Sequence, residues 1–133
     1  MFDSGFFTSE GYGYLLDVAF RAEPAASRFY VGLARRPQTD EIDLELLTSL
    51  EPKVPGYKRA VLVTEDFSRD GRELVTKRFT FSNWDKLPWP PVDIGFVATS
   101  NDGSGILLGW FTLRVRRELM FQEELSDNLR FRF

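Results

Sequence analysis

The sequence contains no cysteine and no histidine. Without cysteine the chain has no disulfides, no thiol nucleophile and no thiolate metal site. Without histidine it lacks the most frequent general base and the most common zinc ligand after cysteine. Together the two absences exclude Cys–His and Ser–His–Asp catalysis and the usual zinc ligand sets. We therefore expect a protein that is not an enzyme and binds no metal or other cofactor.

Long hydrophobic runs are also missing. No apolar stretch approaches the roughly 20 residues of a transmembrane helix, and the N-terminus lacks the basic-then-apolar order of a signal peptide. We expect no membrane partner, and a protein that stays where it is made or assembled. The net charge of −3 and the pI of about 5.0 disfavour nucleic acid, which would require a basic face.

A length of 133 residues is typical of one compact domain. The composition is 43% hydrophobic and includes thirteen phenylalanines, which is enough for a dense core. The charges are unevenly placed: five acids and no bases lie between Pro37 and Glu51, whereas the C-terminal region is rich in arginine. A subunit with an acidic and a basic side could dock head to tail on copies of itself. The alternative is that both regions are ordinary solvated faces.

Residues 1–13 combine large aromatic side chains with three glycines and show neither a helical nor a strand period. We interpret them as an N-terminal arm. Phe2, Phe6 and Phe7 would anchor this arm on a neighbouring subunit, since clustered aromatics outside a periodic element are poorly explained by the core of a lone domain. Alternatively, the three side chains fold back onto the domain's own helix.

Residues 14–133 are expected to form a single β-sandwich domain. Apolar residues from Tyr14 to Ala19 recur at helical spacing and predict a short helix that ends before Pro24. Alternating patterns and turn residues then predict about seven strands. These strands are expected near residues 27–34, 57–63, 73–81, 92–98, 106–113, 118–121 and 129–133. The fold class is therefore mainly β, an antiparallel β-sandwich with a short N-terminal helix and arm.

Turns and the last strand give further detail. Ser68–Gly71 and Asn101–Gly103 are expected hairpin turns. Prolines on both sides of Trp89 exclude that segment from the interior of a sheet. In the last strand, Leu129, Phe131 and Phe133 alternate with Arg130 and Arg132, so the arginines should face outward.

Residues 35–56 are expected to form an acidic loop. Asp40 could cap a short helix within it, although the alternation of residues also permits a strand. Asp40, Glu41, Asp43 and Glu45 could offer carboxylates to a metal ion or to a glycosidic bond, but that chemistry requires fixed separations that a mobile loop seldom provides. We interpret the segment as solvated or facing a partner.

Several short motifs follow one another in a characteristic order. They are Tyr14-Leu15-Leu16, Tyr30-Val31-Gly32-Leu33, Gly56-Tyr57-Lys58-Arg59, Phe79-Thr80-Phe81-Ser82, Trp89, Asp93-Ile94-Gly95-Phe96, Asn101 to Gly105, Ile106-Leu107-Leu108-Gly109-Trp110, and Leu129 to Phe133. Their order and spacing resemble those of small bacteriophage virion proteins, described as tail fibre or structural proteins with a β-sandwich domain. The resemblance covers roughly residues 14–133. The chain departs from it where an acidic loop replaces Gly-rich sequence and where Gln122-Glu123-Glu124 replaces an Asn/Gly-Asp turn.

The resemblance implies a virion component that is made in the host cytoplasm. Its partners would be other virion proteins, such as the major capsid protein or tail components, and copies of itself. We expect a capsid decoration or cement protein; the alternatives are a tail, baseplate or fibre-attachment protein and, more remotely, a carbohydrate-binding module in which Trp84 or Trp89 stacks on a sugar. The predicted partner interface consists of Phe2, Phe6, Phe7, Asp40, Glu41, Asp43, Glu45 and Trp89. For Tyr57, Arg59 and Trp89, the alternative role is packing in the core or at a corner.

Overall fold

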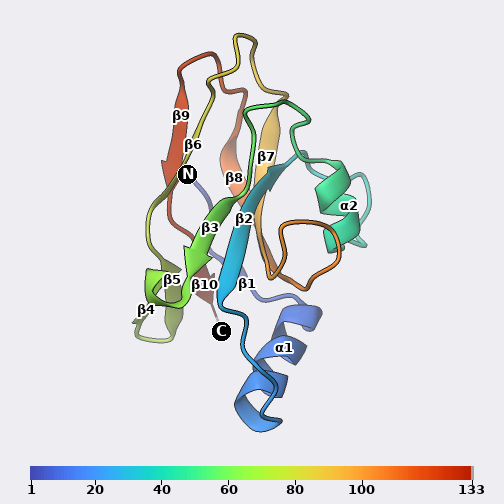
Figure 1. The fold of residues 1–133 in the computed structure, drawn as a ribbon, viewed down its shortest axis with the longest axis vertical. Coiled ribbons are helices and arrows are strands. Elements are labelled where there is room, and N and C mark those ends of the chain that lie inside the picture. The colour runs from blue at the N-terminus through green and yellow to red at the C-terminus, as the bar shows by residue number, and fades with distance from the viewer. Residues whose placement is uncertain (133) are drawn as a thin grey trace.

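The computed structural model describes residues 1–132, so Phe133 of the predicted last strand lies outside the described residues (Figure 1). The strands are β1 (Gly5–Phe6), β2 (Arg28–Ala34), β3 (Ala60–Val63), β4 (Phe67–Asp70), β5 (Glu73–Thr76), β6 (Phe79–Ser82), β7 (Val92–Ala98), β8 (Leu107–Arg117), β9 (Glu124–Asp127) and β10 (Arg130–Arg132). The helices are α1 (Ser9–Phe20), α2 (Leu44–Ser49) and the 3-10 turn η1 (Thr64–Asp66). The mainly β fold class is confirmed, and every strand pairing is antiparallel except that of β1 with β10.

Two four-stranded sheets and one two-stranded ribbon make up the described body. The central sheet has the order β3-β2-β7-β8, the second sheet has the order β1-β10-β5-β4, and β6 pairs with β9. The β7–β8 hairpin was predicted correctly, although β8 continues to Arg117. It forms because two apolar runs are joined by a turn rich in Asn, Asp, Ser and Gly.

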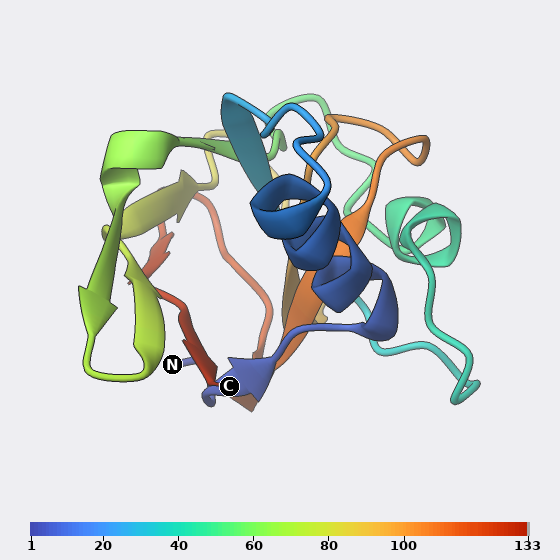
Figure 2. The same ribbon diagram turned by 90° about the horizontal axis from the view of Figure 1, so that it is seen from below.

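Both faces of the central sheet are packed. In β2, Val31 and Leu33 point into the larger core, while Ala34 belongs to a smaller core on the opposite face. The larger core lies between the central sheet and the other strands, and the smaller core lies under α2, which contributes Leu44 and Leu47. Strand alternation explains how one strand serves both cores. The sheet is therefore a middle layer, with α2 on one side (Figure 2).

The N-terminal residues are a seam between two sheets, and the predicted separate arm is wrong. β1 pairs with β10, while Phe2 and Phe7 on either side of it bridge to Leu113 and Gly109 of β8. Residues 1–8 thus hydrogen-bond along the edge of β8 and also reach the second sheet. The helix begins at Ser9 rather than at residue 14, because the Thr8 side chain accepts a hydrogen bond from the backbone of the first turn.

Two predicted strands also need correction. Residues 73–81 divide into β5 and β6, because a straight strand would place Lys77 on the same face as the buried Phe79 and Phe81. Residues 118–121 form no strand, since of these only Leu119 turns inward. The predicted alternation at the C-terminus is confirmed as far as Arg132: Leu129 and Phe131 are buried.

The two expected loops differ in detail from the prediction. Segment 35–56 contains α2, and its cap is Asp43 rather than Asp40, because the Asp43 carboxylate accepts a hydrogen bond from the Leu46 N–H. The turn predicted at Ser68–Gly71 lies at Gly71 and Arg72, between β4 and β5. Gly71 has a φ of 63°, a left-handed conformation that glycine adopts without strain.

Candidate interaction surfaces

The predicted interface residues divide into buried and exposed groups. Phe2, Phe7 and Trp89 are buried in this chain's own larger core, so in this conformation their rings are closed to a neighbour. Phe6, by contrast, is 60% exposed. The sequence pattern failed for Phe2 and Phe7 because their partners, in β8 and β10, are distant in sequence.

Trp89 is a corner residue of the core. Its indole Nε1 donates a hydrogen bond to the Asp85 carboxylate at 2.8 Å, and its ring meets the ring of Tyr57 edge-on at 5.6 Å. Only 2% of its surface is exposed. The expectation that Trp89 stacks on a sugar or contacts a partner is therefore wrong for this conformation, and the alternative of core packing is confirmed.

The acidic residues of segment 35–56 lie on the outside of the molecule. Asp40, Glu41, Asp43 and Glu45 are all exposed, and Asp43 is engaged in capping α2. The segment is not the mobile loop that we expected, because the helix within it is tied to the sheet by a buried ion pair.

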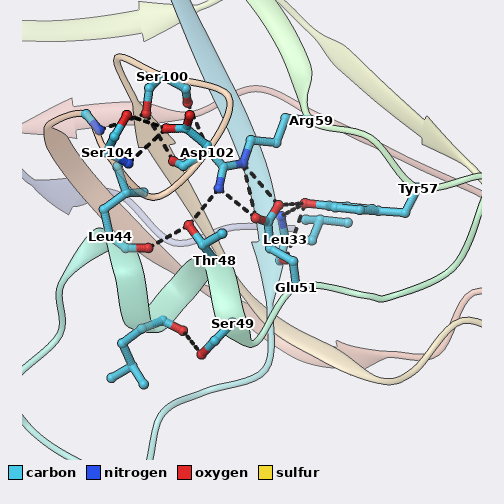
Figure 3. A network of polar contacts seen from close by, with 12 residues as sticks. Leu33, Leu44, Thr48, Ser49, Glu51, Tyr57, Arg59, Ser100, Asp102 and Ser104 are labelled. Atoms are coloured by element: carbon cyan, nitrogen blue, oxygen red, sulfur yellow. Dashed lines mark hydrogen bonds and ion pairs between the residues drawn. The ribbon is translucent and has the colours of Figure 1, made fainter.

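The buried ion pair joins Glu51, just after α2, to Arg59, just before β3 (Figure 3). The closest nitrogen–oxygen distance is 2.6 Å, and the Arg59 side chain is 3% exposed. All guanidinium N–H groups have partners: Nε and Nη2 bond Glu51, Nη2 also bonds Thr48 Oγ1, and Nη1 bonds two backbone carbonyl oxygens of the β7–β8 turn, those of Ser100 and Asp102. A buried charge with every donor satisfied holds its surroundings in one arrangement. Arg59 thus fixes α2 and the β7–β8 turn to the central sheet.

Tyr57 completes this network. Its hydroxyl donates to the Glu51 carboxylate and accepts from the Leu33 N–H at 2.9 Å. Burial raises the pKa of the Tyr57 hydroxyl well above its usual value of 10.0, and the neighbouring Glu51 carboxylate raises that pKa further. Glycine is required at position 32, because a Cβ there would overlap the Phe96 ring that lies beneath Arg59. The sequence pointed to Tyr57 and Arg59, but not to Glu51 as the partner.

Residues 83–91 and 118–123 form two neighbouring loops at the end of the molecule farthest from α1, and both loops expose apolar side chains (Figure 1). We call the four exposed residues the apolar tip: Trp84, Leu87, Met120 and Phe121. Their exposed fractions are 66%, 74%, 49% and 44%. Tryptophan, phenylalanine and methionine are enriched at protein interfaces relative to the rest of a protein surface.

The two loops of the apolar tip are held together by Asn83, which is fully buried. Its side-chain amide donates to the carbonyl oxygens of Leu87 and Leu119, at 3.0 and 2.8 Å. Its backbone N–H and carbonyl bond Glu123 and Gln122. The two loops of the tip are therefore joined by hydrogen bonds. Docking of a partner would cost little conformational entropy, because the backbone of the loops is already held in place. Asn83 and three of the four tip residues were not predicted from the sequence, because they lie in irregular segments; only Trp84 was among the predicted contact residues.

The opposite end carries α1, whose outer side also exposes apolar side chains. Phe20 is 82% exposed and Leu16 is 57% exposed, although both lie on a helix whose other side packs against β8. Leu16 and Phe20 lie on a helix, whereas the tip residues lie on two loops that Asn83 joins. The pair therefore serves as a matched control for substitutions in the apolar tip.

A third surface is the β4–β5 hairpin, on the side of the molecule opposite to α2 (Figure 2). Its acids Asp70 and Glu73 pair with arginines of β10, at 2.8–3.1 Å. Arg69 and Arg72 are exposed and make no ion pair with any residue from 1 to 132. The predicted basic region near the C-terminus is largely engaged in ion pairs, Arg130 and Arg132 with these two acids and Arg114 with Asp3, whereas the hairpin carries exposed arginines without such a pair.

The comparisons with known proteins add no family. No protein-family model matches the sequence, and no significant match is found among curated proteins. Within residues 1–132, no three His, Cys, Asp or Glu side chains gather in an arrangement that could hold a metal ion. None of the helices described is long and apolar enough to cross a membrane.

Proposed function

We propose that this protein is a non-enzymatic structural subunit of a bacteriophage particle, a decoration or cement protein that docks on the head shell through its apolar tip. The observation that carries the proposal is that two loops joined by hydrogen bonds expose four large apolar side chains, those of Trp84, Leu87, Met120 and Phe121. The resemblance of the motif order to small virion proteins supplies the kind of partner.

The chemistry of the tip supports protein docking. Tryptophan, phenylalanine and methionine are enriched at interface centres, and a few such residues supply most of the binding energy. Burial of apolar surface contributes about 25 cal/mol per Å2. On a symmetric shell the same small contact is repeated for every copy, so a modest contact per subunit stabilises the whole shell.

Incorporation into particles tests the proposal. The double variant Trp84→Ala/Leu87→Ala should be reduced about tenfold or more in purified particles. Truncating residues at the centre of an interface lowers the binding free energy by about 2 kcal/mol or more. The matched control is Leu16→Ala/Phe20→Ala at the opposite end, which should be incorporated normally. Circular dichroism of both purified variants checks that they fold. Normal incorporation of the tip variant would remove the tip from the proposal, and absence of the wild-type chain from particles would overturn the proposal entirely.

The copy number distinguishes the head from the tail. Quantitative mass spectrometry of purified particles should give a ratio to the major capsid protein of one or a simple fraction of one. A few to a few dozen copies would replace the decoration role with a tail, baseplate or fibre-attachment role.

Because Trp84 is exposed, sugar binding is a second function that can be tested. An oligosaccharide array that binds the purified wild-type protein but not Trp84→Ala would replace the proposal with a carbohydrate-binding module. We expect no binding, since the second tryptophan once considered for stacking, Trp89, is buried.

A further inference from the structure

We propose that copies of this protein associate head to tail, with the β4–β5 hairpin of one copy docking in a hollow beside segment 36–42 of the next. The inference rests on the proposed function in one respect, namely that many copies meet on one particle. It adds the two surfaces that would join them.

The hairpin has the shape and charge of an inserting element. It forms the edge of the second sheet and projects from the body on the side away from α2 (Figure 1). Gly71 and Arg72 form its turn, with Arg69 and Arg72 exposed and without a carboxylate partner among residues 1–132. Arg130 pairs with Asp70 at 2.8 Å and with Glu73 at 2.9 Å, and Arg132 pairs with Glu73 at 3.1 Å, so two arginines of β10 balance the two acids of the hairpin. The hairpin therefore presents a local excess of positive charge.

The receiving surface is a hollow of about 500 Å3 lined by residues 36–40, Ile42 and Trp110. The Arg36 guanidinium lies 5.8 Å from the centre of the Trp110 ring and forms part of the wall. Asp40 contributes a carboxylate to the lining and Glu41 follows it, both exposed and without a cationic partner in the described chain.

The hollow is preformed. The Asp93 carboxylate accepts a hydrogen bond from the Arg36 N–H, which holds the start of segment 36–42 against β7. The other end of the segment enters α2 through its Asp43 cap, and α2 is fixed by the Arg59–Glu51 ion pair. A wall held at both ends loses little entropy when a partner enters.

Charge determines which partner fits. The lining of the hollow contains the acid Asp40 and the base Arg36, and three further exposed acids of segment 35–56, Glu41, Asp43 and Glu45, give this side of the molecule a net negative charge. The exposed arginines of the hairpin have no acid left to pair with among residues 1–132. A second copy of the chain brings that hairpin to the hollow. Because the two surfaces lie on opposite sides of one molecule (Figure 2), the contact is heterologous and generates rings or open chains, depending on the angle between copies.

Self-association of the purified protein tests this inference. Sedimentation velocity at about 0.02 M and about 0.5 M salt should show oligomers that dissociate in high salt, since exposed charges are screened within a few ångströms there. Arg69→Glu/Arg72→Glu and, separately, Asp40→Arg/Glu41→Arg should each weaken association about tenfold or more. Mixing the two variants should restore a complex, because each retains one native surface and the two reversed surfaces are again complementary.

The control reverses charge elsewhere. Glu23→Arg/Arg28→Glu changes two exposed residues that belong to neither surface and should associate like the wild type. A monomeric wild type at about 0.1 mM and low salt, or variants that fail to associate when mixed although each is folded by circular dichroism, would overturn the inference. Neither result touches the proposed virion role, which is judged by the presence of the wild-type chain in purified particles.

Discussion

One face of the sheet β3-β2-β7-β8 packs against aromatic and aliphatic side chains, whereas the other is closed by α2 with the help of a buried ion pair. On the first face, Val31 and Leu33 belong to the same apolar core as the rings of Phe111 and Phe131. On the second face, Arg59 and Glu51 lie among Thr48, Tyr57 and the β7–β8 turn. Apolar packing tolerates exchange of similar shapes, but a buried charge requires its own partner. The acidic segment 35–56 is therefore held in place by the face with the buried ion pair, where substitutions are tolerated less well.

Removing the cation tests this contrast most severely. Arg59→Ala leaves Glu51 buried and uncompensated, so the free energy of unfolding should fall by about 3–5 kcal/mol in urea denaturation. The double variant Arg59→Met/Glu51→Leu should recover most of this loss, since apolar residues of similar size can replace a buried pair. A loss in Arg59→Ala below about 1 kcal/mol would mean that the two faces do not differ in this way.

Tyr57→Phe removes one hydroxyl from the network around Arg59 and Glu51. The Leu33 N–H then loses its acceptor, and we expect a loss of about 1–3 kcal/mol at neutral pH. The variant should also change the response to alkali. Because the folded pKa of Tyr57 lies above its unfolded value of 10.0, the unfolded state releases the proton first and wild-type stability declines as the pH rises above that value.

Urea unfolding at several pH values measures the second effect. When the pH is raised from neutral to above about 10, the free energy of unfolding should fall more for the wild type than for Tyr57→Phe. Parallel pH curves for the two proteins would show that Tyr57 ionises as readily when folded as when unfolded.

Asp43→Ala affects only the helix on the polar face. The Leu46 N–H loses its cap, which should lower the free energy of unfolding by about 1 kcal/mol. Asp43→Asn is the matched control, because asparagine caps as well as aspartate does, and it should stay close to the wild type. If both variants lose the same amount, the charge rather than the hydrogen bond is what stabilises α2.

Leu33→Met is the mild change on the apolar face. It keeps the volume and removes no polar partner, so the loss should stay below about 1.5 kcal/mol. Thermal or urea unfolding measures it. A cost as large as that of Arg59→Ala would show that the apolar face is no more tolerant than the polar one.

The sequence predicted those elements that depend on adjacent residues. Alternation and a polar turn were enough for the β7–β8 hairpin, and the run ending in Arg132 was assigned to the correct face. The N-terminal seam was missed, because the partners of Phe2 and Phe7 lie in β8 and β10, which no local period can reveal. The apolar tip was missed for another reason: its residues belong to irregular loops, and their exposure depends on the buried Asn83 that links them.

The seam also has a consequence for the order in which the fold is completed. The Phe2 N–H donates to the Asp127 carboxylate, a contact between residues 125 positions apart, and β1 pairs with β10. Contacts of such sequence separation form slowly, because closing a long loop costs chain entropy. Until β1 and β10 meet, the edges of β8 and β5 are open to strands of other chains. Folding intermediates that lack the seam should therefore be the species of this protein most prone to aggregate.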